Sequence, residues 1–132
     1  MSRDNRDNSI TSPTTQARDP NVPPKVLRKL ATNPAWVIRY EVARNTNTPI
    51  DVLNRLAEDE EYFVIREVAR HHATPAYTLV KLANNLMRDL RKVLIQNHNT
   101  PEAVRLWLSN EHEGYAGLSL AEFLEKVGTI DT

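Results

Sequence analysis

The amino-acid sequence predicts an all-α fold, a short α-solenoid built from 26-residue repeats of two helices each, with a capping helix at the C-terminal end. One observation is an interval of 26 positions at which prolines, leucines and small apolar residues recur. Another is the amphipathic helical spacing inside each interval. Periods of about 20 to 50 residues are typical of stacked-repeat proteins. The recurring columns are Pro23, Pro49, Pro75 and Pro101; Leu30, Leu56, Leu82 and Leu108; and Ala17, Ala43, Ala69 and Ile95.

The first helix of each repeat is expected to begin at the recurring proline, because a proline at the first helical position gives up no helical hydrogen bond. The threonine before that proline is the expected N-cap, with its hydroxyl accepting a free backbone N–H. Thr48, Thr74 and Thr100 take this place, and Val22 replaces them in the first repeat. The predicted apolar faces are Val26, Leu27, Leu30 and Ala31; Val52, Leu53, Leu56 and Ala57; and Leu79, Leu82 and Ala83.

The second helix of each repeat follows a polar turn and places apolar residues at positions i and i+4. These pairs are Ile38 and Val42, Val64 and Val68, and Leu90 and Leu94. Helices of about two and a half turns are marginal in water on their own. We therefore expect residues 17–109 to form three full repeats and a half repeat, stabilised by stacking the apolar columns of one repeat on those of the next.

The two ends of the chain depart from the repeat. Residues 1–16 contain a single aliphatic side chain and are expected to form a disordered arm. Residues 110–132 read as a loop and an acidic capping helix that opens with a capping box, Ser119 and Glu122. We expect this helix to cover the last repeat, to bury Phe123 and to contact Trp107. Its predicted apolar stripe is Leu120, Phe123, Leu124 and Val127.

The segment VARNTNTPIDVLNRLAEDEEYFVIREVAR, residues 42–70, resembles the leucine-rich repeat variant family. Units of that family read approximately N-T-P-x-x-L-x-x-L-A-x-D-x-x-x-x-V-R-x-x-V-A, and the resemblance covers residues 17–109. It implies a right-handed helical solenoid, related in shape to HEAT repeats, with no fixed chemistry. It also implies that an Asn or Asp and an Arg six positions later link neighbouring repeats. Arg39 and Arg91 are therefore expected to be structural, whereas Ile65 takes the Arg position in the repeat of Asp59.

Several classes of function are disfavoured by the composition. The absence of cysteine excludes disulfides, iron–sulfur clusters and thiolate zinc sites. No apolar run approaches the length of about 20 residues that a membrane span needs, and the N-terminus has no signal-peptide core, so we expect a cytoplasmic protein. The chain has three glycines, all after residue 113, and hence no phosphate-binding loop. His71, His72 and His98 are expected to be polar turn residues. We expect no catalysis, no metal and no cofactor.

The candidate binding residues are basic side chains that project outward from the second helices. Stacking would align them into a basic stripe that could bind a protein partner or, alternatively, neutralise nucleic-acid phosphates. The plainer alternative is a solvated face with Glu41 and Glu67 interspersed. Trp36 and Tyr62, at the start of these helices, are expected to pack in the core or at its edge rather than to form a binding platform. The residues of the predicted stripe are Arg44, Arg66, Arg70, Arg88 and Lys92.

Charge is distributed unevenly along a chain whose net charge is zero. Residues 17–109 carry 14 Lys and Arg against 10 Asp and Glu, whereas residues 110–132 carry one Lys against five Asp and Glu. This asymmetry indicates an anionic partner or docking of the chain on itself. The function predicted first is a non-catalytic module or adaptor for protein–protein interaction, assumed to be monomeric. Electrostatic binding of nucleic acid is the alternative.

Overall fold

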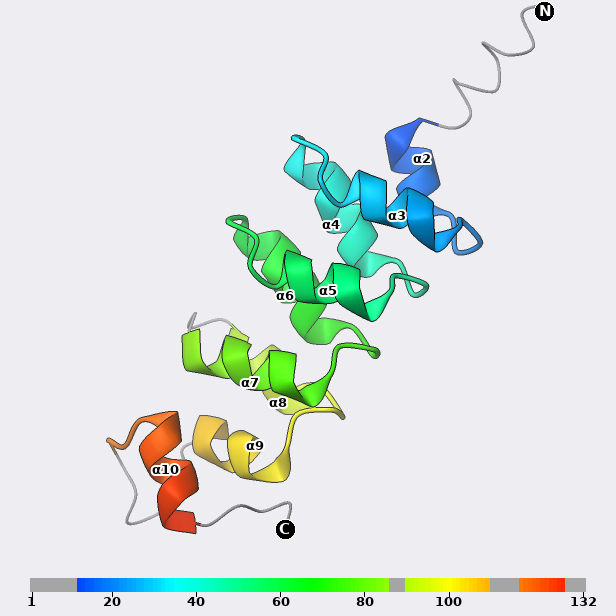
Figure 1. Ribbon diagram of the computed structural model, residues 1–132. Coiled ribbons are helices and arrows are strands. Elements are labelled where there is room, and N and C mark those ends of the chain that lie inside the picture. The colour runs from blue at the N-terminus through cyan, green and yellow to red at the C-terminus, as the bar shows by residue number, and fades with distance from the viewer. Residues whose placement is uncertain (1–11, 86–89, 110–116, 128–132) are drawn as a thin grey trace, which may run out of the picture.

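The computed structural model describes residues 12–85, 90–109 and 117–127. Over these residues every regular element is a helix, so the predicted all-α class is confirmed (Figure 1). The helices are α2 (Pro13–Arg18), α3 (Pro24–Leu30), α4 (Trp36–Arg44), α5 (Ile50–Leu56), α6 (Tyr62–Arg70), α7 (Ala76–Asn85), α8 (Leu90–Gln96), α9 (Glu102–Ser109) and α10 (Leu120–Val127).

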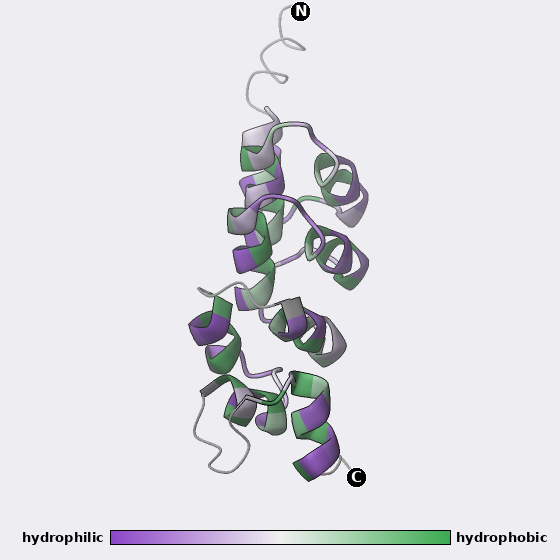
Figure 2. Cartoon of the chain, turned by 90° about the vertical axis from the view of Figure 1, so that its left-hand side faces the viewer, coloured by the Kyte–Doolittle hydropathy of each residue, from purple (hydrophilic) through white to green (hydrophobic). Residues whose placement is uncertain are grey.

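The helices form two rows. In one row α2 packs on α4, α4 on α6, and α6 on α8; in the other, α3, α5, α7 and α9 follow one another along the molecule. Each of α3, α5 and α7 also packs against the helix that follows it in the chain. Figure 2 shows hydrophilic and hydrophobic residues on different sides of the helices, as expected for amphipathic elements that share one core. No helix in the described ranges is both long enough and apolar enough to cross a membrane.

The predicted apolar columns form this core. Leu27, Leu53 and Leu79 lie 26 positions apart and are all fully buried. Each fully buried leucine contributes roughly 1.5–3 kcal/mol, which short helices need in order to offset their ordering entropy. The other residues of the predicted columns that are buried include Leu30, Leu56, Leu82, Leu108, Val42, Val64, Val68, Leu90 and Leu94.

The helix starts differ from the prediction. Pro23 and Pro49 are the N-caps of α3 and α5 and do not occupy the first helical position. The prediction that threonine is the N-cap was wrong: the Thr48 and Thr74 hydroxyls donate to backbone carbonyls six residues earlier, each at 2.6 Å. Both threonines are buried, and each hydroxyl adds a second hydrogen bond to a carbonyl, of Val42 or Val68, that already accepts the backbone N–H of the C-cap residue.

A ladder of polar side chains joins successive turns of the fold at residues 45, 71 and 97. The Asn45 side-chain amide donates to the Ala17 carbonyl at 2.8 Å and to the Asp19 carbonyl at 2.9 Å, and its oxygen accepts the Asn47 N–H at 2.8 Å. These bonds tie α4 to the end of α2. Asn97 makes the same three bonds, to Ala69, His71 and Asn99.

His71 occupies the middle rung of this ladder. Its Nδ1 accepts the Ala73 N–H at 3.0 Å, which places the ring proton on Nε2 and lets Nε2 donate to the Asn45 carbonyl at 2.7 Å. A neutral imidazole thus reproduces both functions of an asparagine side chain. A protonated ring could not accept the Ala73 N–H.

The buried His71 should make stability depend on pH. Burial lowers the pKa of His71 below its ordinary 6.5, and the neighbouring His72 lowers that pKa further, while the bond to Asn45 opposes the shift. The neutral form stabilises the fold fully above pH 6.5. Below this value the unfolded chain binds a proton that the folded His71 does not, so stability falls with pH.

We expect His71→Asn to retain the ladder. The melting temperature of this variant should fall less than that of the parent chain when the pH is lowered from about 7.5 to about 5.5. The effect should be a few degrees at the lower pH. His98→Asn, at an exposed turn position, is the control and should keep the pH dependence of the parent chain. An unchanged pH dependence in His71→Asn would contradict the role assigned to the buried ring.

The C-terminal helix packs as the sequence predicts. The Ser119 N–H donates to Glu122 Oε1 at 2.9 Å, and the Glu122 N–H donates to Ser119 Oγ at 3.2 Å, which confirms the capping box. Phe123 is fully buried, and α10 packs on α9. Trp107 Nε1 donates to the Leu118 carbonyl at 3.0 Å, so the expected contact between Trp107 and this region is present.

The N-terminal segment is more ordered than its composition suggested. Residues 12–16 were expected to be disordered, but residues 13–16 belong to α2, and Ser12 is its N-cap, with Oγ accepting the Thr15 N–H at 3.2 Å. Ala17 is fully buried and α2 packs on α4. The rest of the predicted arm, residues 1–11, lies outside the described residues, as do residues 110–116 of the predicted loop.

Candidate functional site

The predicted basic residues lie on successive helices of one row. Arg44 ends α4, Arg66 and Arg70 belong to α6, and Lys92 belongs to α8. Arg44, Arg70 and Lys92 are exposed, and Arg66 is half-buried. Arg88, the fifth predicted residue, lies outside the described residues.

The two glutamates of these helices do not interrupt the basic residues. Glu41 and Glu67 are only 5% and 9% exposed, so the expected solvated face of mixed charge is wrong. Glu41 bonds Arg18 at 3.1 Å and lies 3.6 Å from Arg44, and Glu67 pairs with Arg66 at 3.3 Å. Guanidinium partners offset the cost of removing these carboxylates from water, which allows both to be buried.

An aromatic cluster lies beside the arginines and joins α4 to α6. The Trp36 and Phe63 rings stack with centroids 5.8 Å apart and an interplanar angle of 23°. Tyr40 meets Trp36 edge-on at 6.1 Å, and Tyr62 meets Phe63 at 5.6 Å. Trp36 and Phe63 nevertheless remain 38% and 43% exposed. Trp36 and Tyr62 therefore take part in a half-exposed cluster, where packing in the core or at its edge was expected.

Two arginines cover this cluster. The Arg44 guanidinium lies 5.6 Å from the centroid of the Tyr40 ring, and that of Arg66 lies 5.1 Å from the centroid of the Phe63 ring. Cation–π contacts of this kind hold long side chains in place. We call this surface the arginine–aromatic face and define it by Trp36, Tyr40, Arg44, Phe63 and Arg66. Aromatic residues and arginine are the types most enriched at the energetic centres of protein interfaces.

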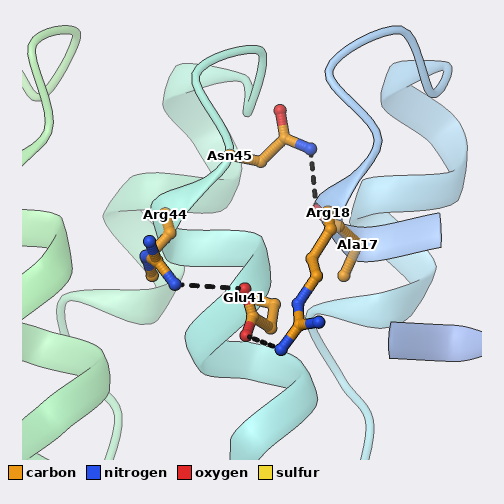
Figure 3. A pocket seen from close by; sticks show the side chains of 5 residues that line it. All are labelled: Ala17, Arg18, Glu41, Arg44 and Asn45. Carbon is orange, nitrogen blue, oxygen red and sulfur yellow. Dashed lines mark hydrogen bonds and ion pairs between the residues drawn. The ribbon is translucent and has the colours of Figure 1, made fainter. Parts of the chain in front are cut away.

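A pocket of about 360 Å³ adjoins the face where α2 meets α4 (Figure 3). Arg18, Glu41 and Arg44 line it together with Ala17 and Asn45. Figure 3 shows Arg18 and Arg44 reaching the same Glu41 carboxylate from two sides. The pocket is therefore a polar recess with two guanidinium groups around one buried carboxylate.

Sequence reasoning did not select Arg18, Tyr40 or Phe63. Arg18 lies 26 positions before Arg44, so the repeat itself carried a signal for it. Tyr40 lies midway between Trp36 and Arg44 at helical spacing. Phe63 had no such signal, because its stacking on Trp36 depends on how α4 and α6 are packed.

Other arginines have structural roles. Arg39 forms a two-pronged ion pair with Asp59, with Nε–Oδ2 at 2.8 Å and Nη2–Oδ1 at 3.1 Å, and also donates to the Asn33 carbonyl. The bond to Asp59 raises the pKa of Arg39. Arg91 donates to the Leu108 carbonyl. Both arginines therefore have the structural role that was expected, Arg39 through Asp59 and the Asn33 carbonyl, and Arg91 through the Leu108 carbonyl.

Within the ranges that the structure describes, no three His, Cys, Asp or Glu side chains are grouped so that they could hold a metal ion. The His71 and His72 rings stack with centroids 4.8 Å apart, and the two nitrogens of His71 are already occupied by backbone groups. His71 therefore acts in the fold through its ladder bonds.

Comparison with models of protein families, with curated proteins and with solved structures finds no match for the chain. Its function is accordingly inferred from the geometry of its own residues.

Proposed function

We propose that this chain is a short α-solenoid of 26-residue two-helix repeats that acts as a non-catalytic protein-binding module. The arginine–aromatic face is its binding surface. Support for the repeat architecture comes from packing between successive helices of one row and from polar bonds that recur at 26-residue spacing. Arrays of this kind offer a long ridged surface suited to macromolecular partners.

The observation that carries this proposal is the exposed stack of Trp36 on Phe63. Large aromatic side chains that stay exposed on a small protein mark an interaction site when they are clustered, whereas scattered ones do not. The stack and its cation–π contacts also restrict the side chains before a partner arrives, which lowers the entropic cost of binding. Removal of an interface centre of this type commonly costs more than about 2 kcal/mol of binding free energy.

The proposal is tested by affinity purification with the full chain as bait. We expect Phe63→Ser to reduce the recovery of specific protein partners by a factor of about ten or more, because removing an aromatic side chain from the centre of an interface weakens binding by that much. Ile50→Ser is the matched control, since Ile50 is a similarly exposed apolar residue in the other row of helices. Circular dichroism of both variants verifies folding. Equal recovery with Phe63→Ser and with the unaltered chain would count against this surface.

Nucleic-acid binding is the second candidate, and one observation favours it. Because Glu41 and Glu67 lie inward, the outward charges of this row are those of the arginines and Lys92, with aromatic rings beside them. Such a surface could contact phosphates and stack unpaired bases. It predicts an affinity for single-stranded oligonucleotides that falls steeply with salt, and a smaller salt slope after Arg66→Ala and Arg70→Ala. Absence of binding at low salt would dismiss this candidate.

A further inference from the structure

We infer that the pocket between α2 and α4 takes a carboxylate side chain of the partner. The partner segment is an extended peptide with an acidic residue three or four positions from a large apolar residue, a spacing set by the distance between the pocket and the aromatic stack. This inference rests on the proposed function, because it specifies what the arginine–aromatic face recognises.

The pocket retains positive charge after its internal pairing. Arg18 and Arg44 share the single carboxylate of Glu41, which leaves about one positive charge without a partner in the recess. Both arginine side chains are more than half exposed. A guanidinium has five N–H donors, and each of these arginines uses few of them on Glu41, so donors remain for an incoming group.

The distribution of charge favours one carboxylate over a run of phosphates. The buried Glu41 forms part of the pocket lining and would repel a strongly anionic group placed over it. Along the face, Arg66 is likewise compensated by Glu67. A nucleic acid needs several uncompensated cations in series, whereas the arginine–aromatic face concentrates its excess charge in one recess; the exposed Arg70 and Lys92 lie outside this face.

The pocket and the aromatic cluster are continuous through Arg44. This residue lines the pocket and also lies over the Tyr40 ring, which in turn meets Trp36. Trp36 and Arg44 are the two ends of α4, so they are separated by about 12 Å at the helical rise of about 1.5 Å per residue. An extended peptide covers this distance in three or four residues at about 3.3 Å each. One segment could therefore place an acid in the pocket and an apolar side chain on the stack of Trp36 and Phe63.

The experiment selects peptides from a random library of about 12 residues displayed on phage, with the immobilised full-length chain as target. We expect the enriched peptides to contain Asp or Glu three or four positions from Trp, Phe or Leu. The best peptide is then synthesised with this acid and with the corresponding amide, and its affinity is measured by fluorescence anisotropy. Replacement of the acid by the amide should weaken binding about tenfold, which is typical of a lost charge-assisted pair.

Variants of the chain assign this effect to the pocket. Arg44→Gln and Arg18→Gln should each weaken binding of the acidic peptide about tenfold and leave binding of the amide peptide nearly unchanged. The amide peptide has already lost the interaction with the arginine, so removing the arginine as well costs no further affinity in a double-mutant cycle. Arg55→Gln, an exposed arginine of α5, is the control and should change neither affinity.

The outcomes separate this inference from the proposed function. Two results would overturn the carboxylate pocket and leave the protein-binding proposal in place. One is that the selected peptides bind through Phe63 but lack the acid. The other is that Arg44→Gln weakens binding of the acid peptide and of the amide peptide by the same factor. Failure of the library to yield any peptide would also overturn the inference. If single-stranded DNA then bound in a salt-dependent manner, the protein-binding proposal would fail as well.

Discussion

Replacing Phe123 with alanine is expected to lower the free energy of unfolding by about 3 kcal/mol. Phe123 is fully buried and lies in α10, which packs on α9. Truncation to alanine removes the largest side chain among the fully buried residues and leaves a cavity under the last helix. Urea unfolding followed by circular dichroism measures the change as a shift of the midpoint.

Glu125→Ala is the matched control on the same helix, because Glu125 is exposed and contributes no burial. Its unfolding midpoint should stay close to that of the parent chain. A Phe123→Ala protein that unfolds at the parent midpoint would show that α10 adds no stability to the array. The C-terminal helix would then be better explained as a motif for docking a partner.

Replacing Arg39 with alanine is also expected to cost about 3 kcal/mol. The Arg39 and Asp59 side chains are only 13% and 7% exposed, so the substitution leaves a carboxylate in a poorly solvated site without its ionic partner. The Glu61 N–H still donates to Asp59 at 2.9 Å, but one hydrogen bond does not replace a two-pronged ion pair. Thermal unfolding by calorimetry measures this loss.

Arg28→Ala is an unusually close control for this prediction. Arg28 and Asp51 form a two-pronged pair of the same chemistry, with distances of 2.9 and 3.2 Å, yet their side chains are 50% and 61% exposed. Water screens exposed pairs, so we expect no measurable change in melting temperature. If both variants lost the same stability, burial would not be the reason that the bond of Arg39 to Asp59 matters.

The sequence was sufficient to predict the helices and the buried columns, since burial in a helical array follows from spacing. It was not sufficient for α2. Residues 12–16 are polar and include proline, a composition typical of disorder. They are ordered because Ala17 is buried in the core and its carbonyl accepts the Asn45 amide, which are contacts with residues far along the chain.

The error about Glu41 in the candidate site followed from the same omission. A glutamate on a short helix is expected to be exposed by default, because glutamate is almost never fully buried unless it is paired. The partner that allows Glu41 to be buried is Arg18 at the end of α2. Without α2 as a helix, neither the buried carboxylate nor the pocket beside it could be predicted. The outward arginines could be predicted, because they depend only on the helical period.

The bonds that join the turns of this molecule have a consequence for the order in which the chain assembles. The long-range ladder bonds of residues 45, 71 and 97, together with the bonds of Arg39 to Asp59 and of Arg91 to Leu108, connect positions 17 to 28 residues apart. Because the entropy of loop closure rises only slowly with loop length, each of these steps carries a similar cost. For the repeat architecture that we propose, we therefore expect folding to start at any adjacent pair of repeats and to spread toward both termini. In native-state hydrogen exchange, amides near α6 should accordingly outlast those of α2 and α10.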